Sequence, residues 1–214
     1  MCYQTRLQKK KEEIKSRFQA DLDDLMSIED FQLNKAFEFP KTPIITNQNE
    51  EKIELAQWGL IPEWAQDDSI KNYTLNARIE TLSEKPSFKN VIQNRCLIIA
   101  DGFYEWQHLS KSNKQKFEIT LSQEKLFAFA GLFSEWFDFD GQLKRTYTII
   151  TTQANDLMSE IHNTKQRMPV ILKPQDEKYW LQGEDYKKYA FPYQEELIAH
   201  PIDKDQNTSQ LSLF

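Results

Sequence analysis

Residues 95–106 read RCLIIADGFYEW, and this stretch decides the predicted fold. The apolar run from Cys96 to Ala100 is typical of a buried strand. The Asp101-Gly102 pair that follows is a turn signal. The stretch therefore predicts a core strand that breaks at Asp101.

Further strands and helices are predicted on both sides of this stretch. Alternating or short apolar runs predict strands at 52–58, 116–121, 126–136 and 167–172, with a hairpin at Asp140-Gly141. Helical patterns occur at 6–26, at 87–94 with Ser87 as a candidate N-cap, and at 153–163, 174–183, 184–190 and 193–200. There is no regular alternation of strand and helix. We therefore predict a single α+β domain over residues 1–200, with a mostly antiparallel, curled or barrel-like sheet and peripheral helices.

The composition supports one domain with a substantial core. The 214 residues include 14 Phe, 8 Tyr and 5 Trp. With only 5 Gly, a glycine-rich phosphate-binding design is disfavoured. The net charge of −6 argues against general nucleic-acid binding, because such proteins are usually basic. Residues 71–95 differ from the rest, since five basic and two acidic side chains give them a net charge of +3.

The two cysteines, Cys2 and Cys96, form no disulfide framework, and Cys96 is expected to be an inert core thiol. The three histidines are scattered, so no metal site is predicted and no cofactor is expected. The first 30 residues lack the apolar stretch of a secretory signal, and there is no run of about 18 apolar residues. We expect a cytoplasmic protein.

Cys2 follows the initiator methionine. If Met1 is removed, Cys2 carries an α-amine and a thiol on neighbouring carbons. An α-amine has a pKa near 7.7–8.0, so roughly a quarter of it is neutral at pH 7.4, far more than for a lysine. Such an amine forms an imine with an aldehyde, and the adjacent thiol can close a thiazolidine ring. Position alone does not separate this role from a cysteine placed there by chance.

Four other stretches contain candidate functional groups. Each also has a structural interpretation, as a turn cap, a surface ion pair, a solvated strand residue or a core aromatic. The candidates are Asn76, Arg78 and Glu80 in NARIET, Glu105 in ADGFYEW, His162 and Arg167 in IHNTKQRMPVIL, and Trp58 and Trp64 in WGLIPEW.

Together these motifs resemble the SRAP family, the SOS-response-associated abasic-site-processing proteins. The matching segments, in order, are MC, WGLIP, NARIET, RCLIIADGFYEW, FAFAGLF, TIITTQAN and IHNTKQRMPVIL. They extend from residue 1 to about residue 200. Any one motif alone is a weak signal, whereas seven in order are specific.

The resemblance implies a covalent partner, the ring-opened aldehyde of an abasic site in single-stranded DNA. It implies that Cys2 is the nucleophile and that Asn76 positions the Cys2 end. It implies that Glu105 moves protons during imine formation and ring closure, and that His162 is a second acid or base. General acid–base groups of this kind are each worth about 10²–10⁴-fold in rate. Arg78 would hold a phosphate beside the abasic nucleotide.

Further DNA contacts are expected from Trp58, Trp64 and Arg167, through base stacking and positive charge. The sequence departs from the family at positions 3 and 4. The family commonly begins Cys-Gly-Arg, whereas this chain has Tyr3 and Gln4, so the usual phosphate contact at position 4 loses its charge. Either Arg6, Arg78 or Arg167 compensates for this loss, or the affinity for DNA is weaker.

The C-terminal residues 201–214 are expected to form a flexible tail. The tail ends in QLSLF, which resembles the bacterial sliding-clamp-binding peptide. The clamp contacts would come from Gln210, Leu211, Leu213 and Phe214, and would place the protein at replication forks. The alternative is that this apolar end folds back onto the domain.

Two other functions remain open at this point. One is an N-terminal-nucleophile amidohydrolase or cysteine peptidase, including self-removal of Met1. The other is a non-catalytic adaptor that binds single-stranded DNA, for which Glu105 and His162 would be replaceable. A monomer is expected in each case.

Overall fold

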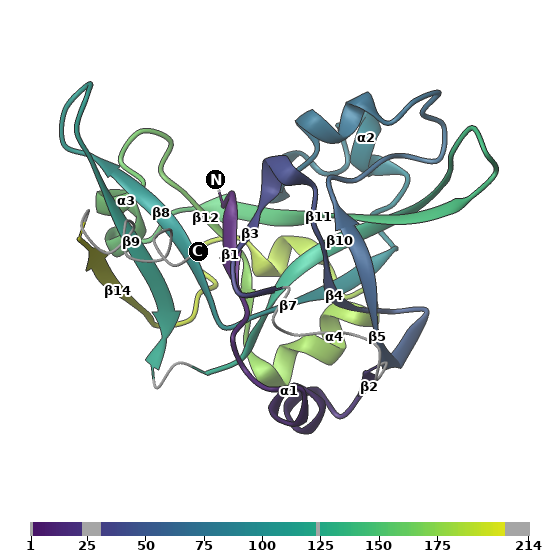
Figure 1. The fold of residues 1–214 in the computed structure, drawn as a ribbon, viewed down its shortest axis with the longest axis horizontal. Coiled ribbons are helices and arrows are strands. Elements are labelled where there is room, and N and C mark those ends of the chain that lie inside the picture. The colour runs from purple at the N-terminus through teal and green to yellow at the C-terminus, as the bar shows by residue number, and fades with distance from the viewer. Residues whose placement is uncertain (1, 23–30, 123–124, 204–214) are drawn as a thin grey trace, which may run out of the picture.

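The two halves of RCLIIADGFYEW belong to different sheets, and Asp101 lies at the corner between them. In the computed structural model, which describes residues 2–22, 31–122 and 125–203, β7 (Arg95–Ala100) and β8 (Gly102–His108) are consecutive strands. β7 lies in a nine-stranded sheet and β8 in a five-stranded sheet. The predicted break at Asp101 is therefore the point where the chain passes from one sheet to the other (Figure 1).

The five-stranded sheet contains the N-terminal strand. Its order is β14-β9-β8-β1-β3, and every pairing is antiparallel. The strands other than β8 are β14 (Leu197–Ile202), β9 (Lys114–Leu121), β1 (Gln4–Arg6) and β3 (Asn34–Lys35). β1 is held on both sides, because it pairs with β8 and with β3.

The nine-stranded sheet follows the order β12-β11-β10-β7-β4-β5-β2, with β13 paired to β10 and β6 paired to β11. Most pairings are antiparallel, and β6 runs parallel to β11. The strands are β12 (Arg167–Pro169), β11 (Leu143–Gln153), β10 (Phe127–Phe137), β4 (Lys41–Thr46), β5 (Asn49–Trp58), β2 (Asp21–Leu22), β13 (Ile171–Leu172) and β6 (Asn76–Arg78). The β10–β11 hairpin turns at the predicted Asp140-Gly141 and extends away from the five-stranded sheet (Figure 1).

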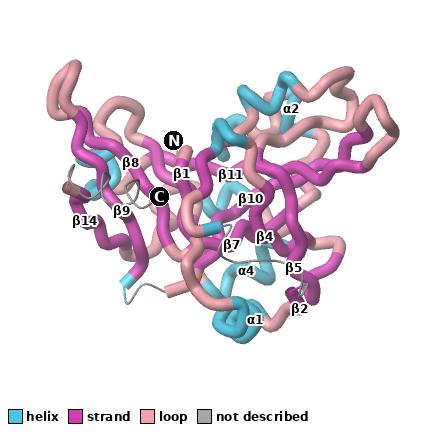
Figure 2. The backbone as a smooth tube through the Cα atoms, in the orientation of Figure 1, coloured by secondary structure: helices cyan, strands magenta, loops and turns pink. Residues whose placement is uncertain are grey.

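The helices are short and lie around the two sheets (Figure 2). The α-helices are α1 (Lys11–Phe18), α2 (Pro86–Lys89), α3 (Asp156–Ile161) and α4 (Glu177–Leu181). The 3₁₀ helices are η2 (Ala36–Glu38), η3 (Ser69–Tyr73), η4 (Ile79–Thr81), η6 (Pro174–Asp176) and η7 (Tyr186–Tyr189). This arrangement confirms the predicted single-domain α+β fold, with a curled sheet core and peripheral helices. None of the described helices is long and apolar enough to span a membrane.

The core between the sheets contains both cysteines. Cys2 and Cys96 are buried in one apolar cluster, to which strands of both sheets contribute. Within it, Phe103 of β8 contacts Phe129 of β10 edge to face, with ring centroids 5.8 Å apart. Burial of such aromatic surface is the main term that holds the sheets together.

Three predicted helical features are wrong. Within the described part of the predicted 6–26, helix α1 covers only residues 11–18, because Arg6 pairs with Gly102 in one sheet and Asp21–Leu22 forms β2 in the other. Residues 23–26 lie outside the described residues. The helix predicted at 193–200 is absent: residues 193–196 have no regular secondary structure, and β14 begins at Leu197, with burial that alternates over residues 197–200 as in a strand. Ser87 lies inside α2, which begins at Pro86.

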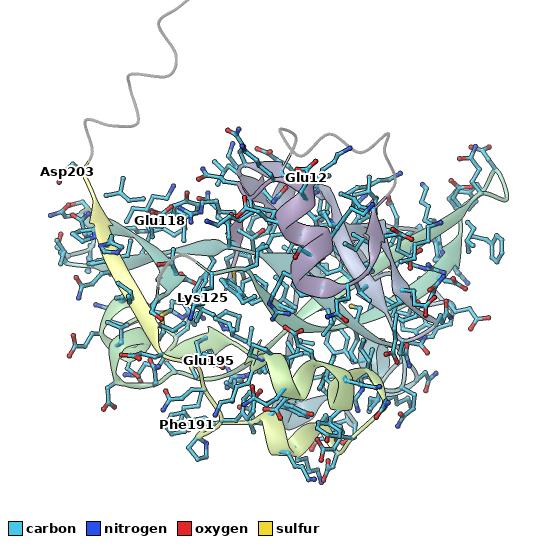
Figure 3. All side chains as sticks on the ribbon, turned by 90° about the horizontal axis from the view of Figure 1, so that it is seen from below. Glu12, Glu118, Lys125, Phe191, Glu195 and Asp203 are labelled. Atoms are coloured by element: carbon cyan, nitrogen blue, oxygen red, sulfur yellow. The ribbon has the colours of Figure 1, made fainter. Side chains whose placement is uncertain are left out.

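The strand β14 extends past the predicted start of the tail. The strand ends at Ile202. Figure 3 shows Asp203 just after this end and Glu195 just before the other end of the strand. The remainder of the predicted tail, residues 204–214, lies outside the described residues, and so does the QLSLF motif.

Candidate active site around Cys2

The N-terminal strand places Cys2 at the start of the five-stranded sheet. In the register of β1, Gln4 lies opposite Tyr104 of β8 on one side and opposite Lys35 of β3 on the other. Cys2 precedes this strand and is fully buried. The sheet therefore fixes the backbone immediately after Cys2.

A buried ion pair anchors this strand to the corner between the sheets. Arg6 Nε lies 2.8 Å from Asp101 Oδ1, and both side chains are buried. The other carboxylate oxygen of Asp101 accepts hydrogen bonds from the backbone amides of Gln8 and Lys9, at 2.6 and 3.0 Å. A second guanidinium nitrogen of Arg6 contacts Glu118 at 2.6 Å. Arg6 is thus a structural anchor, and the expectation that it compensates as a phosphate contact is wrong.

Only part of this anchor is predictable from the sequence. The Asp101-Gly102 break was visible as a turn signal, but the ion pair joins residues 95 positions apart. Gly102 fits the same packing, because a Cβ atom there would lie 3.0 Å from Arg6 Nε and 3.3 Å from a backbone oxygen. A side chain at this corner would displace the arginine that holds β1.

Asn76 joins the nine-stranded sheet to Cys2. Its strand β6 runs parallel to β11, with Asn76 opposite Ile149. The side-chain Nδ2 of Asn76 donates a hydrogen bond of 2.9 Å to the carbonyl oxygen of Cys2. The second atom of this amide, Oδ1, is buried and has no hydrogen-bond partner among the described residues. Asn76 therefore orients the Cys2 backbone and presents a buried acceptor beside it.

Glu105 supplies a buried carboxyl group near Cys2. It lies on β8 and is buried. Burial raises its pKa, because a low-dielectric surrounding disfavours the charged form. The pKa of the Cys2 thiol is also raised, first by burial and then by the negative charge of Glu105. The Cys2 thiol is consequently protonated at neutral pH and needs a base before it can react.

His162 supplies a neutral imidazole. It caps the C-terminus of α3 and is buried. Burial lowers its pKa to about 4. Its Nδ1 lies 2.8 Å from the carbonyl oxygen of Arg167, which can only accept, and this contact favours a proton on Nδ1. A longer contact of 3.3 Å from the Arg167 amide would need the other tautomer. The shorter contact leaves Nε2 as the basic nitrogen.

Arg78 and Lys165 supply exposed positive charge to a groove of about 390 Å³. Arg167 also lines this groove, but its guanidinium is buried and binds both carboxylate oxygens of Glu80, at 2.7 and 2.8 Å. Burial acts to raise the pKa of Glu80, and the hydrogen bonds from Arg167 outweigh it, so the pKa is lowered. The charge of Arg167 is therefore neutralised within the protein, whereas Arg78 and Lys165 face the groove.

The two tryptophans of WGLIPEW occupy different environments. Trp58 is fully buried, donates a hydrogen bond of 2.8 Å to the carbonyl oxygen of Leu75 and stacks on Tyr147. Its predicted DNA contact does not fit, because no face of the indole reaches the surface. Trp64 is 53% exposed and lines a separate groove of about 560 Å³ with Pro86 and Phe137.

Among the described residues, no group of three or more His, Cys, Asp or Glu side chains could hold a metal ion.

The predicted site residues that the structure brings together are Cys2 and Asn76, with Glu105 close enough for its charge to act on the thiol.

Comparison with protein families gives a match over nearly the whole chain. The model of a family described as SOS response associated peptidase (SRAP) matches residues 1–209. The abasic site processing protein YoqW of Bacillus subtilis (strain 168) is 44% identical over 163 residues, which cover 76% of this chain and 70% of that protein. The abasic site processing protein HMCES of Xenopus tropicalis is 33% identical over 193 residues, covering 77% of this chain and 56% of that protein.

Solved structures share the fold. A crystal structure of a protein from Bacteroides thetaiotaomicron has a TM-score of 0.84 and 32% identity, and the match covers 95% of this chain and 93% of that one. A crystal structure of a protein from Bordetella bronchiseptica has a TM-score of 0.80 at 22% identity, over 94% of this chain and 100% of that one. The second likeness shows the fold alone.

Proposed function

Because this chain belongs to the SOS response associated peptidase (SRAP) family, whose named relatives are abasic site processing proteins, we propose that it captures abasic sites in single-stranded DNA through Cys2. The product would be a covalent thiazolidine adduct that shields the lesion. The observation that carries this proposal is the hydrogen bond from Asn76 to the Cys2 carbonyl oxygen. This contact fixes the backbone of Cys2, next to its α-amine, beside the buried Oδ1 atom of Asn76.

The first step would join the α-amine of Cys2 to the aldehyde carbon of the abasic sugar, after Met1 is removed. The amine nitrogen forms a bond to this carbon, giving a carbinolamine. The carbinolamine then loses its hydroxyl as water, giving an imine. Glu105 is suited to donate the proton to the departing hydroxyl, because burial raises its pKa and increases its protonated fraction. The Oδ1 atom of Asn76 could accept a hydrogen bond from the amine.

The second step would close the ring. The sulfur of Cys2 adds to the imine carbon, the thiol proton leaves the sulfur, and a proton is gained by the nitrogen. The overall reaction releases one water and changes no oxidation state. The thiol needs a base, because its pKa is raised, and His162 is neutral at physiological pH and fits this role. The same pair of groups would serve reversal of the adduct.

The groove with Arg78 and Lys165 is proposed to hold the DNA backbone beside the lesion. A guanidinium binds phosphate through two hydrogen bonds, which would fix the neighbouring nucleotide. The Arg167–Glu80 pair would support the wall of this groove without contributing net charge. Trp64 stays a proposed DNA contact, since it is exposed.

Release of Met1 must precede the chemistry, and we propose that the chain catalyses it with the Cys2 thiol. Translation without methionine aminopeptidase tests this step. Mass spectrometry should show loss of Met1 in the wild-type chain and its retention in Cys2→Ala. Retention in both chains would mean that another enzyme removes it.

The C-terminal QLSLF is proposed to bind a bacterial sliding clamp. Its Leu and Phe side chains are typical anchors for an apolar pocket, and tethering would raise the local concentration at replication forks. A pull-down with purified clamp is the test. Binding that is unchanged after deletion of residues 210–214 would exclude this role.

Incubation of the Met1-free protein with single-stranded DNA containing an abasic site tests the main proposal. A heat-stable adduct is expected on a denaturing gel, and Cys2→Ala should abolish it. Cys2→Ser should give only a labile adduct, because an imine cannot close to a thiazolidine without sulfur. Absence of an adduct with the wild-type chain would contradict the proposal.

A further inference from the structure

The chemistry around Cys2 does not use Tyr3, the next residue in the chain, or Phe37, whose ring contacts that of Tyr3. Tyr3 follows Cys2 in the chain, and its ring centroid lies 5.0 Å from that of Phe37, with the planes inclined by 33°. Phe37 is 61% exposed, although it is a large apolar residue. An exposed aromatic ring that packs on the partly buried residue next to Cys2 has the character of a binding surface.

Backbone contacts hold this pair in place. Gln4 of β1 is paired with Lys35 of β3, and the next residue, Ala36, donates its backbone amide to the carbonyl oxygen of Tyr3 over 2.9 Å. Phe37 then follows in the short helix η2. The two rings therefore move with the strand that carries Cys2, and little conformational entropy remains to be lost when a ligand binds.

The charges around Cys2 also act on the Tyr3 hydroxyl. The pKa of this hydroxyl is raised by burial and then by the charges of Glu105 and Cys2. The polar end of Tyr3 therefore lies within electrostatic reach of these groups, while the partner ring of Phe37 faces outward. Lys71 Nζ lies 4.7 Å from the ring centroid of Phe39, at the end of η2, and its charge is paired with Asp68.

We propose that Tyr3 and Phe37 form a stacking platform for the base adjacent to the abasic nucleotide. This inference rests on the proposed function, since capture by Cys2 would bring the neighbouring nucleotide to these rings. An abasic site leaves its neighbour without a stacking partner on one side, and an aromatic ring can take that place. Position 4 is an uncharged glutamine in this chain. Stacking thus supplies affinity where a phosphate contact is missing.

The platform predicts which bases bind well beside the lesion. Purines present a larger π surface than pyrimidines, so a purine neighbour should bind more tightly. Stacking is also less sensitive to salt than a phosphate contact. The part of the affinity that depends on Phe37 should therefore survive at high ionic strength.

The experiment uses single-stranded DNA with a tetrahydrofuran abasic analogue, which has no aldehyde and cannot form an adduct. The fluorescent base 2-aminopurine is placed next to the analogue on its 5′ side, on its 3′ side, or several nucleotides away. Stacking on an aromatic ring should quench one of the two adjacent probes and leave the distant probe unchanged. Phe37→Ala should remove this quenching and weaken binding about 5- to 100-fold.

Two further variants make the result specific. Phe37→Leu keeps an apolar side chain without a π face, so it should also lose the quenching. Phe139→Ala is the matched control, because Phe139 is 86% exposed in the turn of the β10–β11 hairpin, and it should behave as wild type. Quenching that persists in Phe37→Ala or in Phe37→Leu would overturn the platform.

Failure of the platform is distinguishable from failure of the proposed function. Adduct formation with a natural abasic site reports the function and does not require Phe37. If the wild-type chain forms the adduct but Phe37→Ala leaves the quenching intact, only the platform is wrong. If the wild-type chain neither forms an adduct nor quenches an adjacent probe, both are wrong.

Discussion

The side-chain amide of Asn76, on β6 of the nine-stranded sheet, donates a hydrogen bond of 2.9 Å to the carbonyl oxygen of Cys2, which precedes β1 of the five-stranded sheet. This contact joins the two sheets at the proposed nucleophile. The register of both strands must be correct for it to form. The proposed chemistry therefore depends on the relative placement of the sheets as well as on Cys2 itself.

Replacement of Asn76 by alanine should slow adduct formation by about 10- to 100-fold, because misplacement of a reacting group by about 1 Å can cost this much. The free energy of unfolding should fall by only about 1 kcal/mol, the usual net value of one hydrogen bond. Single-turnover gel assays and urea unfolding measure the two effects. Asn72→Ala, which alters an exposed amide of η3, is the control. Equal rates for both variants would show that Asn76 does not position Cys2.

Replacement of Arg6 by alanine should destabilise the protein by about 3–5 kcal/mol, because the carboxylate of Asp101 would stay buried without its partner. Denaturant unfolding at neutral pH is the measurement. Lys35→Ala provides a surface comparison, since the Lys35–Glu38 pair is exposed and should contribute less than about 1 kcal/mol. A small effect of Arg6→Ala, similar to that of Lys35→Ala, would rule out the anchoring role.

The low pKa of His162 predicts how stability depends on pH. The pKa is about 4 in the folded chain and 6.5 in a model compound, so the unfolded state binds more protons between these values. Stability should therefore fall as pH is lowered from about 6.5 to about 4. Denaturation midpoints across this range measure the slope, and His162→Gln should reduce it. An unchanged slope in that variant would mean that other groups cause the pH dependence.

Arg78 and Arg167 should differ in their effects, although both are arginines of the same groove. Arg78→Ala should reduce the slope of log K against log salt by about 0.7, the value for one phosphate contact with a single strand. Arg167→Ala should leave this slope nearly unchanged and lower stability instead, because it leaves Glu80 without its partner. Binding of DNA with a tetrahydrofuran site, measured over a range of salt concentrations, separates the two. A large change of slope in Arg167→Ala would show that its charge reaches the DNA.

The strands could be predicted from sequence where local pattern and tertiary structure agree. RCLIIADGFYEW and the Asp140-Gly141 hairpin are such cases, because buried apolar runs and turn residues are local signals. The prediction of a helix at 6–26 is wrong at its N-terminal end. There the pairing of β1 with β8 overrides the helical spacing of apolar residues. The prediction of a helix at 193–200 is wrong because residues of this segment pair with β9, which is distant in the sequence.

The site residues show the same limit. The sequence identifies Arg6, Arg78 and Arg167 as cations, but it does not reveal which of them meets a carboxylate. Arg167 binds Glu80, 87 positions away, and this contact decides that its charge is neutralised. The burial of Trp58 and the contact between Tyr3 and Phe37 likewise depend on packing between distant segments.

The most direct test of the central claim is the chemical identity of the link to DNA. The Met1-free protein is allowed to react with an abasic single strand, digested, and analysed by mass spectrometry before and after treatment with borohydride and iodoacetamide. We predict that the adduct lies on the peptide that begins with Cys2, has lost one water, gains no hydrogen from borohydride and carries no alkylated sulfur. An adduct on a lysine, or one on Cys2 that borohydride reduces and iodoacetamide alkylates, would contradict thiazolidine formation.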